Sequence, residues 1–152
     1  MIRTTMGATR IQTFSARHLR EARAAKGWSR GRLAAAVDMS VAAVIGWERG
    51  NRTPEPSTLV RLATALDVPP GDLLTIPRSE FGLVELRVIR GLQQQEVAAQ
   101  LFDVTAERVS HIENAFERVP PALVGELAAL NGTSPEEISA AWERGRARLT
   151  HS

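Results

Sequence analysis

The 152-residue chain is 43% hydrophobic, enough for one ordinary domain or two very small ones, and its lack of cysteine excludes disulfide bonds and thiolate metal sites. No apolar run approaches the ~20 residues that a membrane-spanning helix needs. Residues 1–78 carry 12 Arg and Lys against 6 Asp and Glu, and residues 79–152 carry 7 against 11, so a polyanion would be attracted to the first half and repelled by the second.

The N-terminal segment, residues 1–14, lacks helical periodicity and carries Arg3 and Arg10. We predict a flexible arm there, whose arginines could reach a minor groove or the DNA backbone. Simple disorder is the alternative interpretation of the same pattern.

Five helices are predicted in a first domain, residues 15–76. Ser15 can cap a helix that Gly27 ends, since glycine accepts positive φ without a Cβ penalty. Ser29 can cap a second helix and Ser40 a third, with a tight turn between them. After a proline-containing loop, two more helices follow, a fourth with Leu59, Leu62, Ala63 and Leu66 at core spacing and a short fifth at 70–74.

The same pattern returns about 64 residues later, after a predicted boundary that contains Pro77. One extra residue near Phe102 shifts the register so that Glu48 corresponds to Glu113, and the register recovers by Leu123. This recovery favours a true duplication, with a second domain at 79–150 and helices at 80–90, 93–101, 105–113, 121–130 and 135–148.

Both copies resemble the phage-repressor (Cro/C1-type, XRE-like) helix-turn-helix family. In the first copy the residues at family spacing are Gly27, Leu33, Ala34, Ser40, Val44, Trp47, Glu48, Arg49 and Gly50. The second copy is a weaker match, with Asn114-Ala115 in place of Arg-Gly. The resemblance implies an all-α fold of two tandem five-helix, lambda-repressor-like domains. It also implies sequence-specific binding of double-stranded DNA, usually as a dimer and usually in transcriptional repression.

The predicted DNA contacts come from three segments of the first copy. Ser29 and Arg30, at the amino end of the second helix, suit a phosphate. The predicted groove-facing residues of the helix 40–48 are Ser40, Val41, Ala42, Ala43 and Gly46. They are largely apolar, and none of them is an Arg, Asn or Gln that could form two hydrogen bonds with one base. Val41 and Ala42 can contact thymine methyl groups, so we expect weak direct readout supplemented by groove shape. The loop that follows suits phosphates through Arg49, Asn51, Arg52 and Thr53.

Two features of the first copy are predicted to be structural. Arg23 and Glu48 recur as Arg87 and Glu113 in the half whose charge is unsuited to DNA, so we interpret both pairs as intramolecular ion pairs. Trp28 and Trp47 are predicted to lie in the core.

The second copy has different surface chemistry. Its possible DNA contacts are Gln94, Thr105, Glu107, Arg108 and His111, but Glu107 would face phosphates with the wrong sign. A stripe of Phe81, Val84 and Val88, together with Trp142, is predicted to pack on the first domain, a second subunit or another protein. A slightly rotated core is the alternative. The arginines of the last helix lie near its C-terminus, where positive charge interacts favourably with the helix dipole.

The leading hypothesis is a cytoplasmic, homodimeric DNA-binding transcriptional regulator, a repressor that docks the helix 40–48 in the major groove. One alternative is a protein-interaction module, such as an antitoxin or adaptor, built on the same scaffold. Another is a tandem reader that uses both copies on DNA. No nucleophile–base pair, phosphate-cradling glycine loop or metal cluster is visible, so we expect neither an enzyme nor a metal or cofactor site. Nothing argues for a small-molecule effector.

Overall fold

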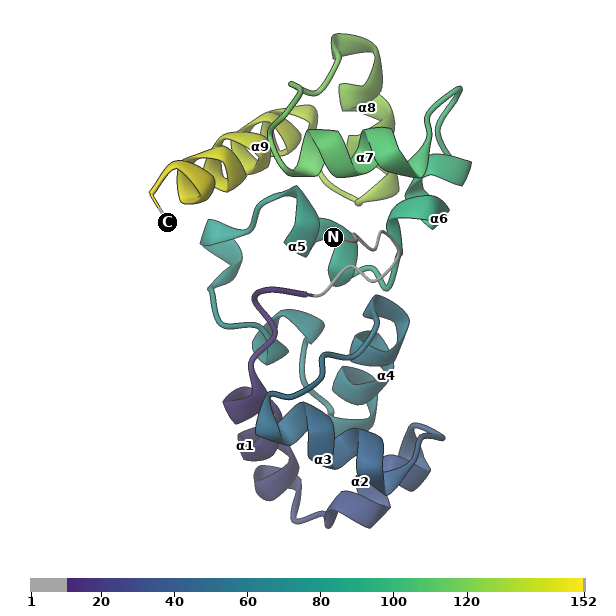
Figure 1. The fold of residues 1–152 in the computed structure, drawn as a ribbon, viewed down its shortest axis with the longest axis vertical. Helices are drawn as coiled ribbons and strands as arrows, with labels where there is room; N and C mark the ends of the chain where they lie inside the picture. Colours follow the sequence, from purple (N-terminus) through teal and green to yellow (C-terminus); the bar gives the residue numbers. More distant parts are fainter. Residues whose placement is uncertain (1–10, 152) are drawn as a thin grey trace, which may run out of the picture. The chain divides into compact units, whose positions relative to one another are not determined.

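The computed structural model describes residues 11–151, and this part of the chain is all-helical, with nine α-helices and two 3-10 helices (Figure 1). The chain divides into two compact units between Thr75 and Ile76, here called unit 1 and unit 2. No helix among the described residues is long and apolar enough to cross a membrane. Arg3 and Arg10 lie outside the described residues.

Unit 1 contains four α-helices and a 3-10 helix: α1 (Ala16–Lys26), α2 (Arg30–Ala36), α3 (Val41–Arg49), α4 (Pro56–Leu66) and η1 (Pro70–Leu73). Ser15, Ser29 and Ser40 cap the first three helices, each accepting a hydrogen bond from the backbone N–H three residues later. Gly27 ends α1 with a φ of 74°. The predicted caps are therefore confirmed.

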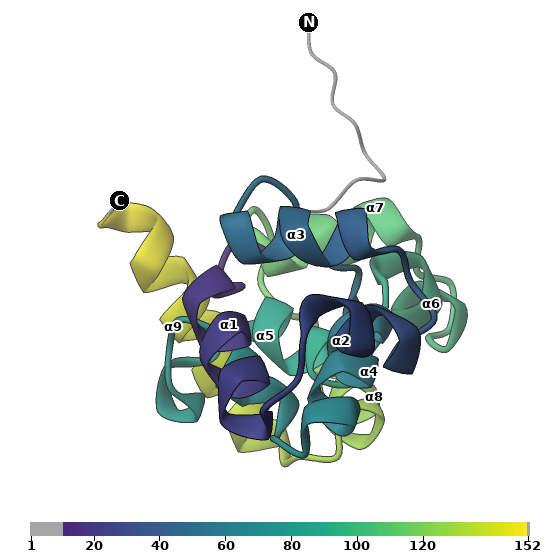
Figure 2. The ribbon, with the colours of Figure 1, turned by 90° about the horizontal axis from the view of Figure 1, so that it is seen from below.

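The core of unit 1 is a set of side chains that are at most 2% exposed, contributed by all four α-helices: Leu19, Leu33, Val44, Trp47, Leu59 and Leu62. Within the unit, α1, α2 and α4 lie on one side of α3 (Figure 2). Trp47 is a core residue as predicted. The same prediction for Trp28 is wrong, because this ring is half-buried in the surface turn between α1 and α2, with Lys26 and Arg32 over it at 5.4 and 4.8 Å from its centroid.

The last residues of the predicted flexible arm are part of the fold. Ile11 and Phe14 are 2% and 9% exposed, Phe14 forms an isolated bridge with Leu74, and the Thr75 N–H donates to the Thr13 carbonyl. The arm prediction is therefore wrong for residues 11–14, because apolar side chains and backbone pairing attach this segment to the end of unit 1.

Unit 2 contains one 3-10 helix and five α-helices: η2 (Arg78–Glu80), α5 (Leu83–Val88), α6 (Gln94–Ala99), α7 (Ala106–Glu113), α8 (Pro121–Leu130) and α9 (Pro135–Thr150). The helix α5 begins three residues later than predicted, because the Glu85 carboxylate accepts the Gly82 N–H at 2.8 Å and stabilises the helix start there.

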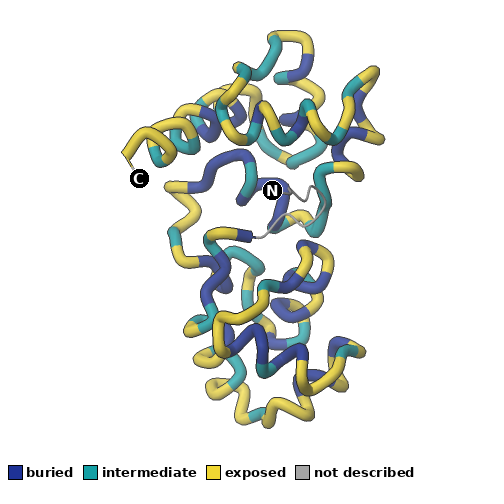
Figure 3. Tube along the Cα trace, in the orientation of Figure 1, coloured by how far each residue is buried: buried dark blue, intermediate teal, exposed yellow. Residues whose placement is uncertain are grey.

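Three of the four residues of the predicted interface of unit 2 are buried. Much of the α5 segment is dark blue, and so buried, in Figure 3. Phe81 and Val88 are each 1% exposed and Trp142 is 6% exposed, while Val84 is half-buried. The reason is α9, which packs against α5 and whose Arg144 Nε donates to the Phe81 carbonyl at 2.8 Å. The structure agrees with the alternative of a rotated core. The prediction that this stripe and Trp142 pack on the first domain, a second subunit or another protein is wrong where it needs Phe81, Val88 and Trp142 exposed for a second subunit or another protein.

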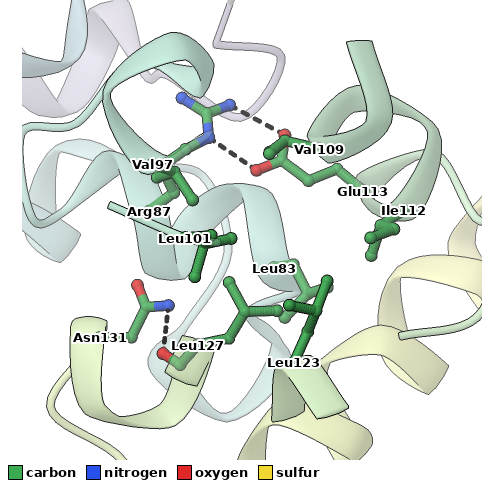
Figure 4. A pocket seen from close by; sticks show the side chains of 10 residues that line it. All are labelled: Leu83, Arg87, Val97, Leu101, Val109, Ile112, Glu113, Leu123, Leu127 and Asn131. Carbon is green, nitrogen blue, oxygen red and sulfur yellow. Dashed lines mark hydrogen bonds and ion pairs between the residues drawn. The ribbon is translucent and has the colours of Figure 1, made fainter. Parts of the chain in front are cut away.

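Unit 2 has a partly open cavity of about 20 Å³ beside the Arg87–Glu113 pair (Figure 4). Val97 and Ile112 line this cavity. By sequence register the corresponding core residues of unit 1 are the larger Leu33 and Trp47. Two other lining residues, Leu101 and Leu127, are larger than their unit 1 counterparts Val37 and Ala63, so the space lies beside the smaller side chains and is not filled by the larger ones.

Filling this cavity should stabilise unit 2. We expect Val97→Leu, which restores the unit 1 residue, to raise the free energy of unfolding of unit 2 by about 0.5–1 kcal/mol. The reciprocal change in unit 1, Leu33→Val, should lower that of unit 1 by about 0.5–1.5 kcal/mol, because Leu33 is fully buried in a filled core. Urea titration of each variant measures both effects, and a destabilising Val97→Leu would show that the space cannot accept one more methylene.

Candidate DNA-binding surface

The helices α2 and α3 are joined by a tight turn. Asp38 adopts a left-handed conformation with a φ of 56°, and the Met39 N–H donates to the Ala34 carbonyl at 2.9 Å. Aspartate tolerates this conformation better than most residues. The turn therefore ends α2 and lets Ser40 start α3 in a new direction, which is the arrangement of a helix-turn-helix.

A buried carboxylate links α3 to the first two helices. The Glu48 side chain is 1% exposed and accepts two hydrogen bonds from Arg23, at 2.5 Å from Nε and 3.0 Å from Nη2. Arg30 Nε donates to the same carboxylate at 2.9 Å, and Arg23 Nη1 also donates to the Trp28 carbonyl. The predicted Arg23–Glu48 ion pair is confirmed, and it holds α3 at a set position on α1 and α2.

Arg30 was predicted to contact a DNA phosphate, but in the structure it is part of this network. Its side chain is 50% exposed, but Nε is committed to Glu48. Arg30 therefore helps to hold α3 as well as standing next to the Ser29 cap at the start of α2.

The hydrogen bonds also determine the ionisation of Glu48. Burial opposes its charged form, but the hydrogen bonds from Arg23 and Arg30 outweigh burial and hold the pKa of Glu48 below its usual value of 4.5. A lowered pKa in the folded state means that unfolding takes up a proton at acidic pH.

Unit 1 should accordingly lose stability in acid. The contribution of the Glu48 carboxylate is complete above the pKa of the unfolded chain and is lost as the pH falls through the lower pKa of the folded chain. We expect the melting temperature of unit 1 to fall below about pH 4.5, and to fall less steeply in Glu48→Gln, which has no proton to take up. Thermal melts across this range, followed through the Trp47 indole NMR signal, measure the difference; parallel pH profiles for the two proteins would contradict it.

The outward face of α3 consists of Val41, Ala42, Ile45 and Arg49, which lie within about 100° of one another around the helix axis. Val41 is 45% exposed, Ala42 and Arg49 are exposed, and Ile45 is half-buried. We call Val41, Ala42 and Ile45 the apolar strip of α3. Ile45 was not among the predicted DNA contacts, although its spacing of four residues from Val41 places the two on one side of a helix.

Two residues expected on this face are buried instead. Ala43 is 2% exposed because it points toward the unit 1 core, and Gly46 is covered by the side chain of Arg52. A Cβ at Gly46 would lie 2.7 Å from Arg52 Cδ, so the glycine makes room for the arginine. The prediction that Ala43 and Gly46 face outward is therefore wrong.

The loop after α3 carries exposed basic and polar groups. Gly50 ends the helix with a φ of 79°, and the N–H groups of Asn51 and Arg52 both donate to the Gly46 carbonyl. Arg49 and Arg52 are exposed, and neither forms an ion pair with any residue in the described range. Thr53 is half-buried, and with Arg52 it lines a polar hollow of about 210 Å³. The C-terminal end of α3 thus presents two cations beside its apolar strip.

Unit 2 repeats the buried network with different residues. Arg87 donates to Glu113 at 2.6 Å from Nε and 3.0 Å from Nη2, and Gln94 Nε2 donates to the same carboxylate at 2.9 Å. Arg87 Nη1 donates to the Leu92 carbonyl, as Arg23 does to Trp28. The second predicted ion pair is confirmed, and Gln94 is engaged in it.

The outward face of α7 is polar and acidic where that of α3 is apolar and basic. By register its residues are Ala106, Glu107, Ser110 and Asn114, with Glu107 in the place of Ala42. Glu117, in the register of Arg52, accepts hydrogen bonds from Arg108 Nε and Nη2 at 3.0 and 2.7 Å. The cation of Arg108 is therefore neutralised within the unit.

The remaining candidates of unit 2 have structural partners. Thr105 caps α7 by accepting the Arg108 N–H, and His111 packs edge-on against Phe116, with ring centroids 5.9 Å apart. In α9, Arg144 pairs with Glu137, Arg146 with Glu143 and Arg148 with Glu85. The arginines of the last helix thus serve contacts inside unit 2.

A comparison with known families matches residues 19–73 to the helix-turn-helix family model. Searches of the curated proteins and of the solved structures found no significant match. The matched residues run from Leu19 in α1 to the end of η1 and so include the turn between α2 and α3. Residues 19–73 are therefore similar to the helix-turn-helix family, and this match supports a DNA-binding helix-turn-helix regulator in general terms.

Proposed function

We propose that the protein is a sequence-specific transcriptional repressor that docks α3 of unit 1 in the major groove of double-stranded DNA. The observation that carries this proposal is the outward face of α3, within the residues that match the helix-turn-helix family. This face is bordered by Arg49 and Arg52, which form no ion pair among residues 11–151. The remaining contacts are Ser29, Arg30, Ser40, Asn51 and Thr53, which stand at the two helix starts and in the loop after α3. The net positive charge of residues 1–78 also supports binding of DNA by unit 1, since DNA is a polyanion.

Unit 2 is, in this proposal, a degenerate second copy of the domain. Support comes from the buried network, in which Arg87, Glu113 and Gln94 make the same set of contacts as Arg23, Glu48 and Arg30. Its outward face has lost the features that suit DNA, since Glu107 and Glu117 stand where Ala42 and Arg52 stand in unit 1. We assign unit 2 to dimerisation or to another protein contact, in a homodimer that acts on chromosomal DNA in the cytoplasm.

A specific observation favours a protein contact for unit 2. Phe102, in the segment before α7, and Phe116, in the segment after it, are 85% and 79% exposed. Aromatic side chains are enriched at protein interfaces, and their exposure on an acidic unit is consistent with an adaptor or antitoxin role. This second function does not require DNA binding, so the two are separable.

Selection from a random duplex DNA pool with the full chain at moderate salt tests the proposal. An enriched inverted repeat is the expected result, and its spacing would give the distance between the α3 helices of a dimer. Enrichment of a direct repeat or of one long asymmetric site would show that both units read DNA. Failure to enrich any sequence would contradict the proposal and favour the protein-interaction module.

A further inference from the structure

We infer that unit 1 recognises its DNA site chiefly through the C5-methyl groups of pyrimidines. The inference rests on the proposed function and names the chemical feature of the base pair that α3 reads. Its starting point is the apolar strip, Val41, Ala42 and Ile45, which occupies the outward face through the first two turns of the helix.

The strip lacks the groups that usually read base edges. Guanine and adenine are recognised in the major groove by the paired donors and acceptors of Arg, Asn or Gln. On the outward face of α3 the first such side chain is Arg49, in the last turn, next to the loop. The other exposed polar group at the start of the helix is the Ser40 hydroxyl, which already accepts the Ala43 N–H at 3.0 Å.

An apolar surface selects among base pairs in two ways. It gains free energy by covering the methyl group of thymine, and it leaves the polar edge of an unmethylated G·C pair without a partner. 5-Methylcytosine carries the same C5-methyl group as thymine, so the strip could contact either base. The strip therefore favours base steps that carry such methyl groups.

The charges beside the apolar strip favour duplex DNA, and not an apolar protein surface, as its partner. Arg49 and Arg52 border it without ion-pair partners among the described residues, and Asn51 is exposed between them. The equivalent face of unit 2 has Glu107 in the register of Ala42 and a neutralised Arg108. The combination of apolar strip and bordering cations is thus a feature of unit 1 alone among the two units.

Thymine-to-deoxyuridine replacement tests the inference directly. In the duplex that the selection enriches, each thymine is replaced singly by deoxyuridine, which removes the methyl group and keeps the base pair. We expect the affinity of the full chain to fall about fourfold for each methyl group that the strip covers, and tenfold or more for two. A C·G pair in place of a sensitive T·A pair should bind weakly; recovery with 5-methylcytosine would show that both bases are read, and no recovery would restrict reading to thymine.

Two variants of α3 separate methyl recognition from general binding. In Val41→Ala/Ile45→Ala the ratio of affinities for the thymine and deoxyuridine duplexes should fall toward one, because the strip no longer reaches the methyl group. In Arg49→Ala both affinities should fall together and the ratio should stay as in the unchanged protein. Circular dichroism checks that both variants keep their helical content.

The outcomes distinguish the inference from the proposed function. Equal affinity of the unchanged protein for the thymine and deoxyuridine duplexes, with the selected sequence still preferred, would overturn the inference and leave the proposed function in place. A deoxyuridine effect that persists unchanged in Val41→Ala/Ile45→Ala would also overturn it. Failure to select any duplex would instead remove the proposed function.

Discussion

Replacement of Arg49 and Arg52 by alanine is expected to weaken DNA binding by the full chain about 100-fold or more. Both side chains are exposed and have no carboxylate partner among residues 11–151, so their charge is available to phosphates. A hydrogen bond to a charged group contributes about 1.5–3 kcal/mol, and two such bonds give a loss of this size. The log–log dependence of affinity on salt should become shallower by about two units, because two fewer phosphates are neutralised.

The matched control removes two arginines from unit 2. Arg90 and Arg118 are exposed, and their replacement by alanine lowers the net charge of the chain by the same amount. We expect this control to change the affinity by only a few fold, through the overall field of the protein. Titration of the selected duplex at several salt concentrations gives both quantities. Similar losses in the two double variants would mean that charge acts at a distance and that α3 is not the docking element.

Replacement of Glu48 by alanine is expected to lower the free energy of unfolding of unit 1 by about 3–5 kcal/mol. The Glu48 side chain is 1% exposed, and its removal leaves the guanidinium groups of Arg23 and Arg30 without their carboxylate. A small domain has a total stability of about 5–15 kcal/mol, so unit 1 would be largely unfolded near physiological temperature if its stability lies at the lower end.

The duplicated network supplies a matched experiment in unit 2. Glu113→Ala should destabilise unit 2 by a similar amount, because it leaves the buried guanidinium of Arg87, whose side chain is 3% exposed, without its carboxylate partner. The indole NMR signals of Trp47 and Trp142 report unit 1 and unit 2 separately during urea unfolding. A surface control, Glu21→Ala, breaks the exposed pair with Arg17 and should cost less than about 1 kcal/mol. Losses below about 1 kcal/mol in both buried variants would show that the network is not a main source of stability.

The sequence predicted most of what depends on neighbours along the chain. Ser15, Ser29 and Ser40 cap helices because each side chain bonds a backbone N–H only three residues away. Gly27 ends α1 because the local backbone requires a positive φ. Recurrence of Arg23 and Glu48 as Arg87 and Glu113 revealed the ion pair, although its residues are 25 positions apart in the first copy and 26 in the second.

Exposure was predicted less well than position. The sequence placed Trp28 in the core, but the ring lies at the surface between two cations. The pattern also predicted that Phe81 and Val88 are available to a partner, but both are buried, and α9 packs against α5, which contains Val88. In both cases the burial of a side chain depends on a segment that local patterns do not locate.

The same distinction applies to the DNA-binding surface. Helical periodicity in the sequence determined which residues of α3 share a side, because the spacing of 3.6 residues per turn is a property of the backbone alone. Which side faces outward was decided by the tertiary structure, in which the buried Glu48 carboxylate and the packing against α1 and α2 set the rotation of α3 about its axis. That rotation buries Ala43, covers Gly46 with Arg52 and brings Ile45 to the outward face, because contacts between residues far apart in the chain, and not local propensity, set the orientation of a helix.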